Sequence, residues 1–424
     1  MPRPWTIARR GEKRGQGRGR QAAEACGTAE AGQAVHPGEA DEGKRRRSGE
    51  RRRDTGQVNL RERIGALADT LAANGELTDE KWRAALHAVP RHLFAPAVAW
   101  AEPYAGPGYR IDRDIDASAW WDAVYADHPI ITQLDDGATE VGGGEGVYSS
   151  SLSAPGVVVD FLELLSPYDG DRVLEIGTGT GWTAGLLSHR LGDGNVVSVE
   201  IDPAVHERAA ASLKKAGFGP RLVLGDGADG WAEQAPYDRV HVTCGVREVP
   251  YAWVEQTRPG GAIVLPWMPG FEPGHKLWLT VGRDGTATGR FAGGAHYMMM
   301  RAQRVPAPPE HEGGYGRRAA TVDPRRVLRA GLGADVAIAG CLPDVSASLG
   351  TGEEFEIWLW AGRSGAWITG SEVRQFGARN LWDEVEEAFF RWVEWGSPGR
   401  DRFGLTVTPD GQHLWLDRPD NVIP

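Results

Sequence analysis

The sequence is poor in cysteine and has no long apolar run. Its 424 residues include only 3 cysteines, Cys26, Cys244 and Cys341, which lie far apart. Because they show neither paired metal-ligand spacing nor a disulfide framework, the sequence suggests no zinc site and no oxidising environment. No apolar stretch approaches the roughly 20 residues of a membrane-spanning helix, and the N-terminus lacks an apolar secretory segment. We therefore expect a cytoplasmic protein without a membrane partner.

Charge is unevenly spread along the chain. Residues 1–54 contain 14 Lys and Arg against 8 Asp and Glu, a balance of +6, which leaves about −17 for the rest because the whole chain carries −11. An acidic body repels phosphate backbones, so nucleic acid is not the expected partner, whereas cationic peptides are attracted. Residues 1–56 are rich in Arg and Gly and have little to bury, which predicts a disordered basic arm without an assigned function.

Two helices and a long connection are expected after this arm. Apolar residues recur at helical spacing up to Asn74, and a second helix is expected between Thr78, as its cap, and Pro90. Residues 97–150 are expected to be irregular, with scattered aspartates. Such a long segment is typical of a lid or binding loop, and a solvated loop is the alternative. The aspartates lack the spacing of a calcium loop.

Helices and short apolar strands alternate between residues 154 and 266. The expected strands are 172–176, 196–200, 222–224, 239–243 and 262–266, and the expected helices are 155–165, 181–191 and 203–216. This alternation predicts an α/β fold, with a doubly wound and mostly parallel sheet covered by helices on both faces. A further strand is expected at 276–281.

The C-terminal quarter has a different composition. Residues 306–324 have the Pro, Gly and charge content of a linker, and 325–424 predict an α+β domain with a strand at 354–360, an amphipathic helix at 381–395 and a hairpin around Pro409-Asp410-Gly411. Five of its aromatics offer contact area for a peptide, although their spacing favours packing in the core for most of them: Trp358, Trp360, Trp392, Trp395 and Trp415.

The strongest local pattern is the run VLEIGTGTG at 173–181, in which a buried strand enters a glycine turn and then a helix. Such a turn lets the backbone approach a ligand closely. Glu200 ends the next strand, where a carboxylate can accept from both hydroxyls of a ribose, and Asp226 follows the third strand, where it can accept from an adenine amino group. Two carboxylates suit an adenosine with a cationic sulfonium better than a pyrophosphate, so S-adenosylmethionine is the expected cofactor. Each acid alone also suits an ordinary loop or helix cap.

At these residues the chain from about 60 to 266 resembles the bacterial protein-L-isoaspartate O-methyltransferases. The resemblance rests on AVPRHLF at 88–94, SLSAP at 151–155 and LEIGTGTGW at 174–182, with 225–227, 230–231, 235–238, 249–250, Gln256 and 260–261 following in the family's order. It implies a class I, Rossmann-like methyltransferase domain over 57–305, with an N-terminal helical extension and the insertion 97–150.

The resemblance also implies a set of site residues. Ser153 takes the place of the family's active-site serine. Methylating a carboxylate needs no general base, and a hydroxyl that aligns one carboxylate oxygen is sufficient help, but Ser153 precedes a helix and suits an N-cap equally well. No metal is expected, and the implied cofactor-binding residues are Ser150, Ser151, Leu152, Glu175, Gly177, Thr178, Gly179, Thr180, Gly181, Glu200, Ile201, Asp226 and Gly227.

Three departures from the typical repair enzyme narrow the resemblance. They are the long segment between Phe94 and Ser153, Gly156 in place of a bulky residue, and about a hundred C-terminal residues without a counterpart. Together they resemble a subfamily encoded with ribosomally synthesised modified peptides, namely lanthipeptides and graspetides. This implies a modified precursor peptide as partner, in which an aspartate side chain is methylated and the ester collapses through succinimide to aspartimide or isoaspartate.

Other functions stay open at this point. General repair of isoaspartyl damage in proteins is the alternative activity, and a non-catalytic peptide-binding protein is the alternative outside enzymes. Nucleic-acid methylation is disfavoured because the strand at 239–243 leads into Cys244-Gly245 without the Asn/Asp-Pro-Pro-Tyr turn that amino methylation uses. The C-terminal domain is interpreted as the substrate-recognition domain, and the oligomeric state is not indicated.

Overall fold

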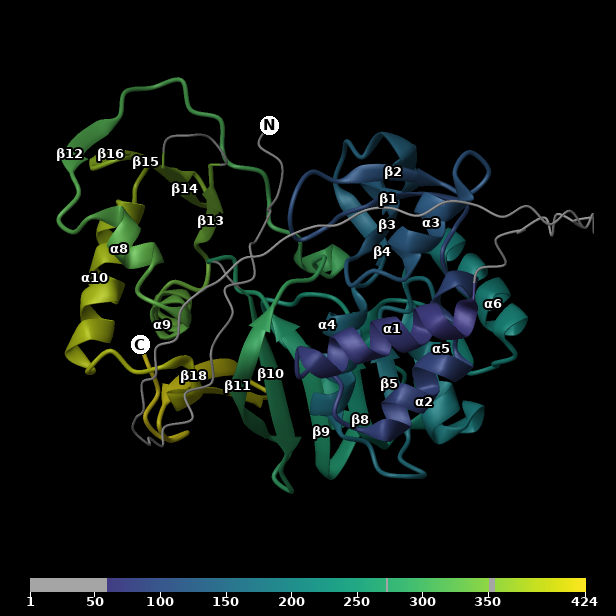
Figure 1. Ribbon diagram of the computed structural model, residues 1–424. Coiled ribbons are helices and arrows are strands. Elements are labelled where there is room, and N and C mark those ends of the chain that lie inside the picture. Colours follow the sequence, from purple (N-terminus) through teal and green to yellow (C-terminus); the bar gives the residue numbers. More distant parts are fainter. Residues whose placement is uncertain (1–58, 272–273, 351–354) are drawn as a thin grey trace, which may run out of the picture.

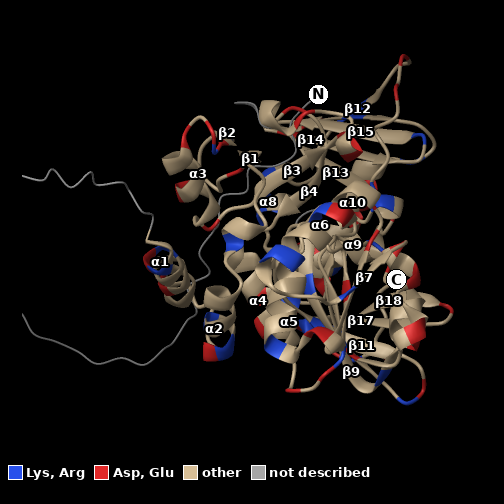
Figure 2. Ribbon diagram, turned by 90° about the vertical axis from the view of Figure 1, so that its right-hand side faces the viewer, with Lys and Arg blue, Asp and Glu red and all other residues tan. Residues whose placement is uncertain are grey.

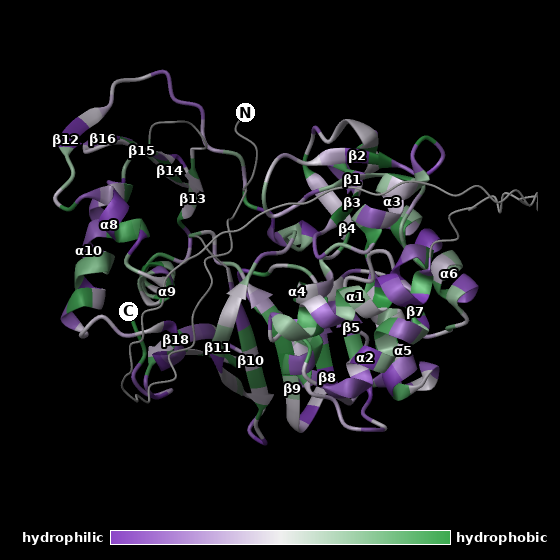
Figure 3. Ribbon diagram, in the orientation of Figure 1, coloured by the Kyte–Doolittle hydropathy of each residue, from purple (hydrophilic) through white to green (hydrophobic). Residues whose placement is uncertain are grey.

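The computed structural model describes residues 59–271, 274–350 and 355–424, so the predicted basic arm lies outside the described residues. Three sheets organise this part of the chain: one large central sheet and two small ones that stand apart from each other above it (Figure 1). The strands of the large sheet are mostly apolar, whereas the outer helices carry intermixed basic and acidic residues (Figures 2 and 3). Within the described residues, no helix combines the length and apolar character that crossing a membrane requires.

The large sheet has a parallel half and an antiparallel half. The parallel strands are β5 (Val173–Ile176), β6 (Val196–Glu200), β7 (Arg221–Leu224), β8 (Tyr237–Val242) and β9 (Thr257–Trp267), and the antiparallel ones are β10 (Gly274–Val281), β11 (Ala287–Ala295), β17 (Phe403–Thr408) and β18 (Gly411–Leu416). Their order is β18-β17-β11-β10-β9-β8-β5-β6-β7. The predicted α/β fold is confirmed, and every predicted strand is present. The prediction missed β11.

Helices cover both faces of the parallel half. On one face lie α4 (Pro155–Leu165), α5 (Trp182–Leu191) and α6 (Pro203–Ala216), with α1 (Leu60–Ala73) and α2 (Glu80–Ala88) outside them; α7 (Tyr251–Glu255) lies on the other. The predicted cap of α2 is wrong by one residue. Asp79 accepts from the Lys81 N–H at 2.8 Å, whereas the Thr78 hydroxyl donates to Glu163 at 2.8 Å.

The segment 97–150, expected to be irregular, instead forms strands and a helix. It contains β1 (Val98–Ala101), β2 (Tyr109–Asp112), α3 (Ala117–Val124) and β3 (Ile130–Leu134), and β4 (Tyr148–Leu152) completes a sheet of order β2-β1-β3-β4. Ile111, Trp120 and Ile130 are at most 1% exposed and belong to the same hydrophobic core as α1, α2, α4 and α5. We call this sheet the insertion sheet. Its strands are only four or five residues long, and such short strands carry little periodicity.

A five-stranded sheet forms on the other side, which we call the C-terminal sheet. It consists of β12 (Gly316–Ala319), β13 (Ser346–Leu349), β14 (Glu356–Ala361), β15 (Ser364–Thr369) and β16 (Glu372–Phe376), and α8 (Pro324–Leu328), α9 (Leu332–Cys341) and α10 (Leu381–Glu394) accompany it. The predicted helix and hairpin are confirmed. The hairpin, β17 and β18, pairs with β11 and thus extends the large sheet. The strand β12 lies within the expected linker 306–324 and pairs with β16 of the C-terminal sheet. The division of the chain at 306–324 stays a prediction.

Short 3-10 helices connect these elements. They are η1 (Arg91–Leu93), η2 (Asp135–Gly137), η3 (Val141–Gly143), η4 (Asp193–Asn195), η5 (Gly227–Asp229), η6 (Ala232–Gln234), η7 (Arg301–Gln303) and η8 (Arg400–Arg402).

The pairing of β17 with β11 leads to a prediction about stability. Leu405 in β17 is fully buried in the core of the large sheet. We expect Leu405→Ala to lower the free energy of unfolding by about 3 kcal/mol, since truncating a buried leucine costs roughly 2–5 kcal/mol. Urea unfolding measures this. Val422→Ala, at a side chain that is 50% exposed, is the control and should change the value by less than about 0.5 kcal/mol. If Leu405→Ala changed the free energy of unfolding as little as Val422→Ala does, β17 would lie outside the cooperative core.

Candidate functional site

The glycine turn after β5 is held in a conformation that only glycine adopts without strain. Gly177 and Gly179 have φ angles of 93° and 54°. The Gly177 N–H donates to the Val199 carbonyl at 2.9 Å, and a Cβ at Gly177 would lie 2.6 Å from the Thr243 hydroxyl oxygen. The turn therefore lies directly against the ends of β6 and β8, with Thr180 and Gly181 (φ 89°) leading into α5.

Glu200 binds this turn from the end of β6. Its carboxylate accepts from the Gly179 N–H at 2.9 Å and from the Asp202 N–H at 3.0 Å. Burial raises the pKa of Glu200, and the backbone donors oppose that rise. The next side chain, Ile201, is 39% exposed, so an apolar surface lies beside the carboxylate.

Asp226 and Gly227 follow β7 and approach the same turn. One oxygen of Asp226 accepts from the Ala228 N–H at 2.9 Å. A Cβ at Gly227 would lie 2.6 Å from a methyl group of Ile176, so only glycine lets this segment come so close to the end of β5. The Trp253 indole N–H fixes the segment by donating to the Gly227 carbonyl at 2.8 Å. Glu200 thus contacts the glycine turn, and the segment that begins with Asp226 lies against the end of β5, which leads into that turn.

Glu175 lies underneath the turn, within the sheet. It is 0% exposed, one of its oxygens accepts from the Ser198 hydroxyl, and the other has no hydrogen-bond partner among the described residues. The Ser198 hydroxyl also lies 2.6 Å from that of Thr178. Burial is the main reason that the pKa of Glu175 rises to about 8. Glu175 therefore supports the turn from within the sheet, whereas Glu200 binds it from the end of β6.

The segment with Ser150, Ser151 and Leu152 is β4 of the insertion sheet, and it passes over the turn. The position of a Cβ at Gly179 lies 3.5 Å from the Ser151 carbonyl oxygen. The structure therefore brings the predicted serine segment and the predicted glycine turn together. This was not evident from their 28-residue separation in the sequence.

Ser153 is not the cap of α4. The N-cap position belongs to Ala154, and the carboxylate of Asp127 from the insertion accepts the Gly156 N–H at 2.7 Å. The interpretation of Ser153 as a helix cap is therefore wrong. Within the described ranges its hydroxyl has no hydrogen-bond partner, which leaves it available to a ligand. The lack of a side chain at Gly156 also matters locally, because a Cβ there would lie 2.4 Å from the Glu76 carboxylate.

Two groups of the site were missed by sequence reasoning. Arg91, buried at 1% exposure, donates to the carbonyls of Leu152 and Ser153 at 3.2 and 2.9 Å. Asp202 accepts from Gln133 at 3.1 Å and from Arg301 at 3.0 Å. Burial alone raises the pKa of Asp202, but hydrogen bonds from Val205 and Arg301 lower it to about 2. Arg91 lies within the AVPRHLF run at 88–94, but that run gave no sign of a role in the site, because the partners of both Arg91 and Asp202 are distant in the sequence.

The loop after β8 packs against methionine sulfur atoms. Gly245 exchanges backbone hydrogen bonds with Met298 and Met300, both at 2.8 Å, and a Cβ there would lie 2.5 Å from the Met268 sulfur. The preceding Cys244 thiol has its pKa raised to about 12 by burial and by the carboxylates of Glu200 and Asp226. It is therefore protonated at neutral pH, and we assign it no nucleophilic role.

The aspartates of the insertion are occupied by protein partners. Asp116 caps α3, Asp122 pairs with Arg63 at 2.6 Å, and Asp136 binds Arg304 at 2.6 Å. In the part of the chain that the structure describes, no group of three or more His, Cys, Asp or Glu residues is placed to hold a metal ion. These aspartates therefore have structural partners that account for them.

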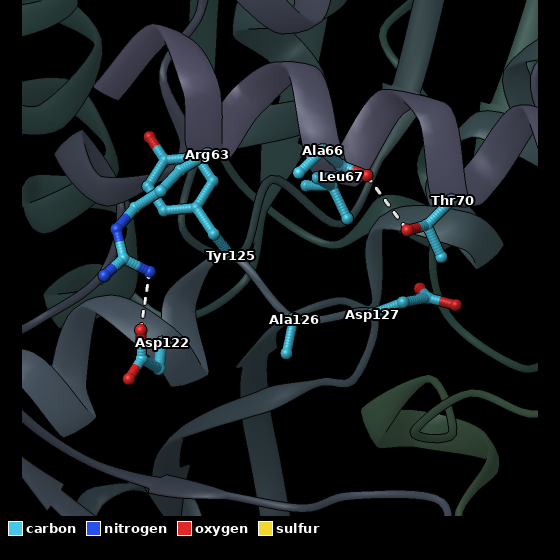
Figure 4. A pocket seen from close by; sticks show the side chains of 8 residues that line it. All are labelled: Arg63, Ala66, Leu67, Thr70, Asp122, Tyr125, Ala126 and Asp127. Carbon is cyan, nitrogen blue, oxygen red and sulfur yellow. Dashed lines mark hydrogen bonds and ion pairs between the residues drawn. The ribbon is translucent and has the colours of Figure 1, made fainter. Parts of the chain in front are cut away.

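A separate hollow of roughly 380 Å³ lies between α1 and the insertion (Figure 4). The Arg63–Asp122 ion pair lies at one end, Thr70 and Asp127 lie at the other, and Tyr125 and Ala126 lie between them. None of the predicted site residues lines it. The hollow is thus distinct from the site at the glycine turn.

Comparisons with known proteins agree with this geometry. A family model described as Protein-L-isoaspartate(D-aspartate) O-methyltransferase (PCMT) matches residues 146–273, which include the serine segment, the glycine turn and both acids. Protein-L-isoaspartate O-methyltransferase 2 of Archaeoglobus fulgidus is 33% identical over 202 residues, which are 47% of this chain and 76% of that protein. The protein-L-isoaspartate O-methyltransferase of Methanopyrus kandleri is 31% identical over 248 residues, 58% of this chain and 93% of that protein.

One solved structure also matches part of the C-terminal residues. A structure titled protein-L-isoaspartate O-methyltransferase has a TM-score of 0.50 at 21% identity, and the match covers 84% of this chain and all of that one. Such coverage must include part of residues 325–424. This structure therefore has a counterpart to part of the C-terminal residues, which the typical repair enzyme is expected to lack. A comparable fold extends into the C-terminal part.

The buried carboxyl of Glu175 predicts a pH dependence of stability. Its folded pKa of about 8 lies above the roughly 4.3 of an unfolded glutamate. Between these values the folded protein retains a proton that the unfolded chain releases, so this group's stabilisation is present below pH 4 and is lost as the pH rises towards 8. We expect Glu175→Gln to flatten the fall in unfolding free energy between pH 5 and pH 8, measured in urea. Glu233→Gln, at an exposed position, serves as control and should leave the slope unchanged. Parallel profiles of Glu175→Gln and wild type would contradict the assignment.

Proposed function

The chain belongs to the protein-L-isoaspartate O-methyltransferase family and is an S-adenosylmethionine-dependent carboxyl O-methyltransferase, and from this premise we propose that it methylates an aspartate side chain in a ribosomally synthesised modified peptide. The observation that carries the proposal is the Ser153 hydroxyl, which has no partner among the described residues and follows β4 directly where that strand passes over the glycine turn. The insertion sheet to which β4 belongs stands over this acceptor side (Figure 1).

The residues around the turn fit the cofactor. Glu200 and Asp226 provide carboxylate oxygens for ribose hydroxyls and an adenine amino group, and the exposed Ile201 provides an apolar surface for the adenine ring. Their negative charges suit the cationic sulfonium. Glu175, with one unpartnered buried oxygen, would act from below by fixing the turn. We assign Ser150, Ser151, Leu152, Gly177, Thr178, Gly179, Thr180, Gly181 and Gly227 to the wall of the same cofactor site.

Methyl transfer requires the protein mainly to align the acceptor carboxylate with the methyl group. S-adenosylmethionine supplies a methyl group bonded to a positively charged sulfur. The acceptor carboxylate is already ionised at neutral pH, so no residue has to remove a proton. Ser153 donates a hydrogen bond to one carboxylate oxygen and thereby orients the other towards the methyl group. Such alignment accounts for a large part of the rate in reactions of two bound partners.

The ester explains the later product without further catalysis. In the methylated aspartate, the backbone nitrogen of the next residue attacks the ester carbonyl, the nitrogen–carbon bond of a five-membered imide forms, and methoxide leaves with the nitrogen's proton. Water then opens the imide to aspartate or isoaspartate. The protein needs only to install the ester.

The C-terminal sheet supports a peptide as substrate. Trp358 and Trp367 are paired across β14 and β15, their rings stack at 4.9 Å, and the Arg374 guanidinium lies 5.0 Å from the Trp367 ring centroid. Both indoles are half-buried on the face opposite the core residues Ile357 and Leu359. Of the five tryptophans considered from the sequence, Trp358 and Trp360 lie on this outer face, whereas Trp392 and Trp415 are buried and Trp395 packs against the core.

General repair of isoaspartyl residues is the second candidate. It is favoured by the solved family structure whose match extends into the C-terminal part. The two functions differ in the preferred acceptor, so methyl transfer should be compared on a generic isoaspartyl peptide and on modified peptides encoded near this gene. Mass spectrometry distinguishes the ester, which adds one methylene, from the imide, which lacks one water. Equal kcat/KM on the generic peptide would favour repair over the modified peptide.

Ser153→Ala tests the acceptor site. Because the hydroxyl aligns the carboxylate and does not bind the cofactor, we expect kcat to fall about 10- to 100-fold. The affinity for S-adenosylmethionine, measured by calorimetry, should change by less than about twofold. Ser371→Ala, on an exposed turn, is the control. An unchanged kcat in Ser153→Ala would remove the serine from the mechanism.

Trp358→Ala tests peptide recognition by the C-terminal sheet. Losing one stacked indole at the centre of a contact surface should raise KM for the modified peptide about tenfold and leave turnover of a short isoaspartyl peptide unchanged. The matched control is Trp278→Ala, which removes an indole that is 40% exposed on β10 of the large sheet. Similar effects of both variants on KM would rule out a specific role for the outer face.

A further inference from the structure

A buried guanidinium binds residues 152–155, which join β4 to α4 and carry Ser153, and which we call the acceptor loop. Arg91, in η1, is 1% exposed, and all its hydrogen-bond partners are backbone carbonyls. Three of them belong to the insertion and two to the end of β4 and the residue after it: Val124, Ala126 (3.5 Å), His128 (3.0 Å), Leu152 (3.2 Å) and Ser153 (2.9 Å). One side chain thus joins the insertion to the segment that carries the serine.

The two terminal nitrogens of the Arg91 guanidinium bind different sets of carbonyls, and Nη2 fixes the backbone of the acceptor loop. Nη1 donates to Val124 and Ala126, whereas Nη2 donates its two hydrogens to His128, Leu152 and Ser153, so that at least one hydrogen is shared; Nε has no partner among the described residues. Two consecutive carbonyls, those of Leu152 and Ser153, therefore point at the same nitrogen. In an extended strand consecutive carbonyls point in opposite directions, so the fork holds the backbone of Ser153 out of the strand conformation, where β4 ends.

The same side chain also reaches the cofactor side. The Arg91 guanidinium carbon lies 5.5 Å from the centroid of the Trp182 ring, and Trp182 is the first residue of α5, immediately after the glycine turn. The Trp182 indole N–H donates to the Val89 carbonyl at 3.0 Å, which fixes the ring relative to η1. Arg91 is thus in contact with both halves of the site.

The charge of Arg91 is not neutralised by a direct ion pair. Among the described residues no carboxylate lies within ion-pair distance of it, although Asp127 is close enough to oppose the effect of burial, which lowers the pKa of Arg91 to about 10. Burying a cation is costly unless hydrogen bonds compensate it. A neutral side chain would avoid that cost, so a packing role alone does not explain an arginine here.

We propose that Arg91 is a positioning residue for methyl transfer, which sets the orientation of the Ser153 hydroxyl and makes it depend on the insertion sheet. The inference rests on the proposed role of Ser153 as the group that aligns the acceptor. The planar fork is essential, since a lysine presents one point donor and cannot hold five carbonyls in two segments. Asp127 strengthens the same link, because it binds the Gly156 N–H just beyond the acceptor loop.

The experiment compares Arg91→Lys with a matched buried arginine. Arg239 is 7% exposed and pairs with Asp171 at 3.2 Å, at the amino end of β8 and away from the glycine turn. We expect Arg91→Lys to lower kcat on an isoaspartyl peptide about 10- to 100-fold with KM for S-adenosylmethionine within about twofold, since small misplacements at a reacting centre have effects of that size. Arg239→Lys should lower the melting temperature and leave kcat unchanged. Equal losses of kcat in both variants, or unchanged kcat in Arg91→Lys, would overturn the inference.

Two further measurements separate positioning from general destabilisation. If Arg91 acts through Ser153, the double variant Arg91→Lys, Ser153→Ala is no slower than Ser153→Ala alone, whereas multiplied losses would overturn the inference. Hydrogen exchange of residues 150–156 in the absence of substrate should be faster in Arg91→Lys than in Arg239→Lys. If Ser153→Ala alone is fully active, the proposed function of the serine fails. Unchanged exchange in Arg91→Lys contradicts the proposed fork independently of activity.

Discussion

The carboxyl edge of the large sheet depends on one constraint: backbone groups that are buried without a helix or strand partner must still be hydrogen-bonded. Glu200 accepts the Gly179 N–H, Asp127 accepts the Gly156 N–H, and Arg91 donates to carbonyls of two segments. Each side chain comes from an element other than the one it satisfies. The bonds that remove the cost of unpaired groups therefore also fix how the segments of the site lie relative to one another.

The parallel core could be predicted because each of its strands and helices is specified by residues that are close together in the sequence. The strands β5, β6 and β8 are short apolar runs that alternate with helices, and β6 and α6 lie at the expected residues. The insertion sheet could not be predicted, because its four short strands are stabilised by pairing with one another and are weakly periodic alone. The strand β11 was missed for a related reason. Its glycines, such as Gly289 beside the Trp278 carbonyl, permit close strand pairing but do not favour strands.

The site could be predicted only in part, for the same reason. Acids at the ends of parallel strands gather at one edge, so Glu200 and Asp226 followed from the strand positions, and the structure brings Ser151 to the same turn. Arg91 belongs to the AVPRHLF run at 88–94, but its role in the site was not foreseen, because its partners are backbone carbonyls, which are present at every residue and leave no pattern in the sequence. The cap of α4 was assigned to the wrong residue because its acceptor, Asp127, is 29 positions away from the N–H that it binds.

In the proposed function, the two small sheets around the acceptor loop determine which peptide is methylated. In the proposed site, the glycine turn and its acids bind the cofactor, and they do not distinguish one aspartyl peptide from another. The insertion sheet contributes β4 itself to the loop, so changes in that sheet reach Ser153 through Arg91 and affect the rate of transfer. The C-terminal sheet shares one hydrophobic core with the large sheet, and the Ala347 N–H also donates to the Gly270 carbonyl at 2.8 Å. Because these contacts do not include the acceptor loop, this sheet is placed to change binding without changing the chemistry.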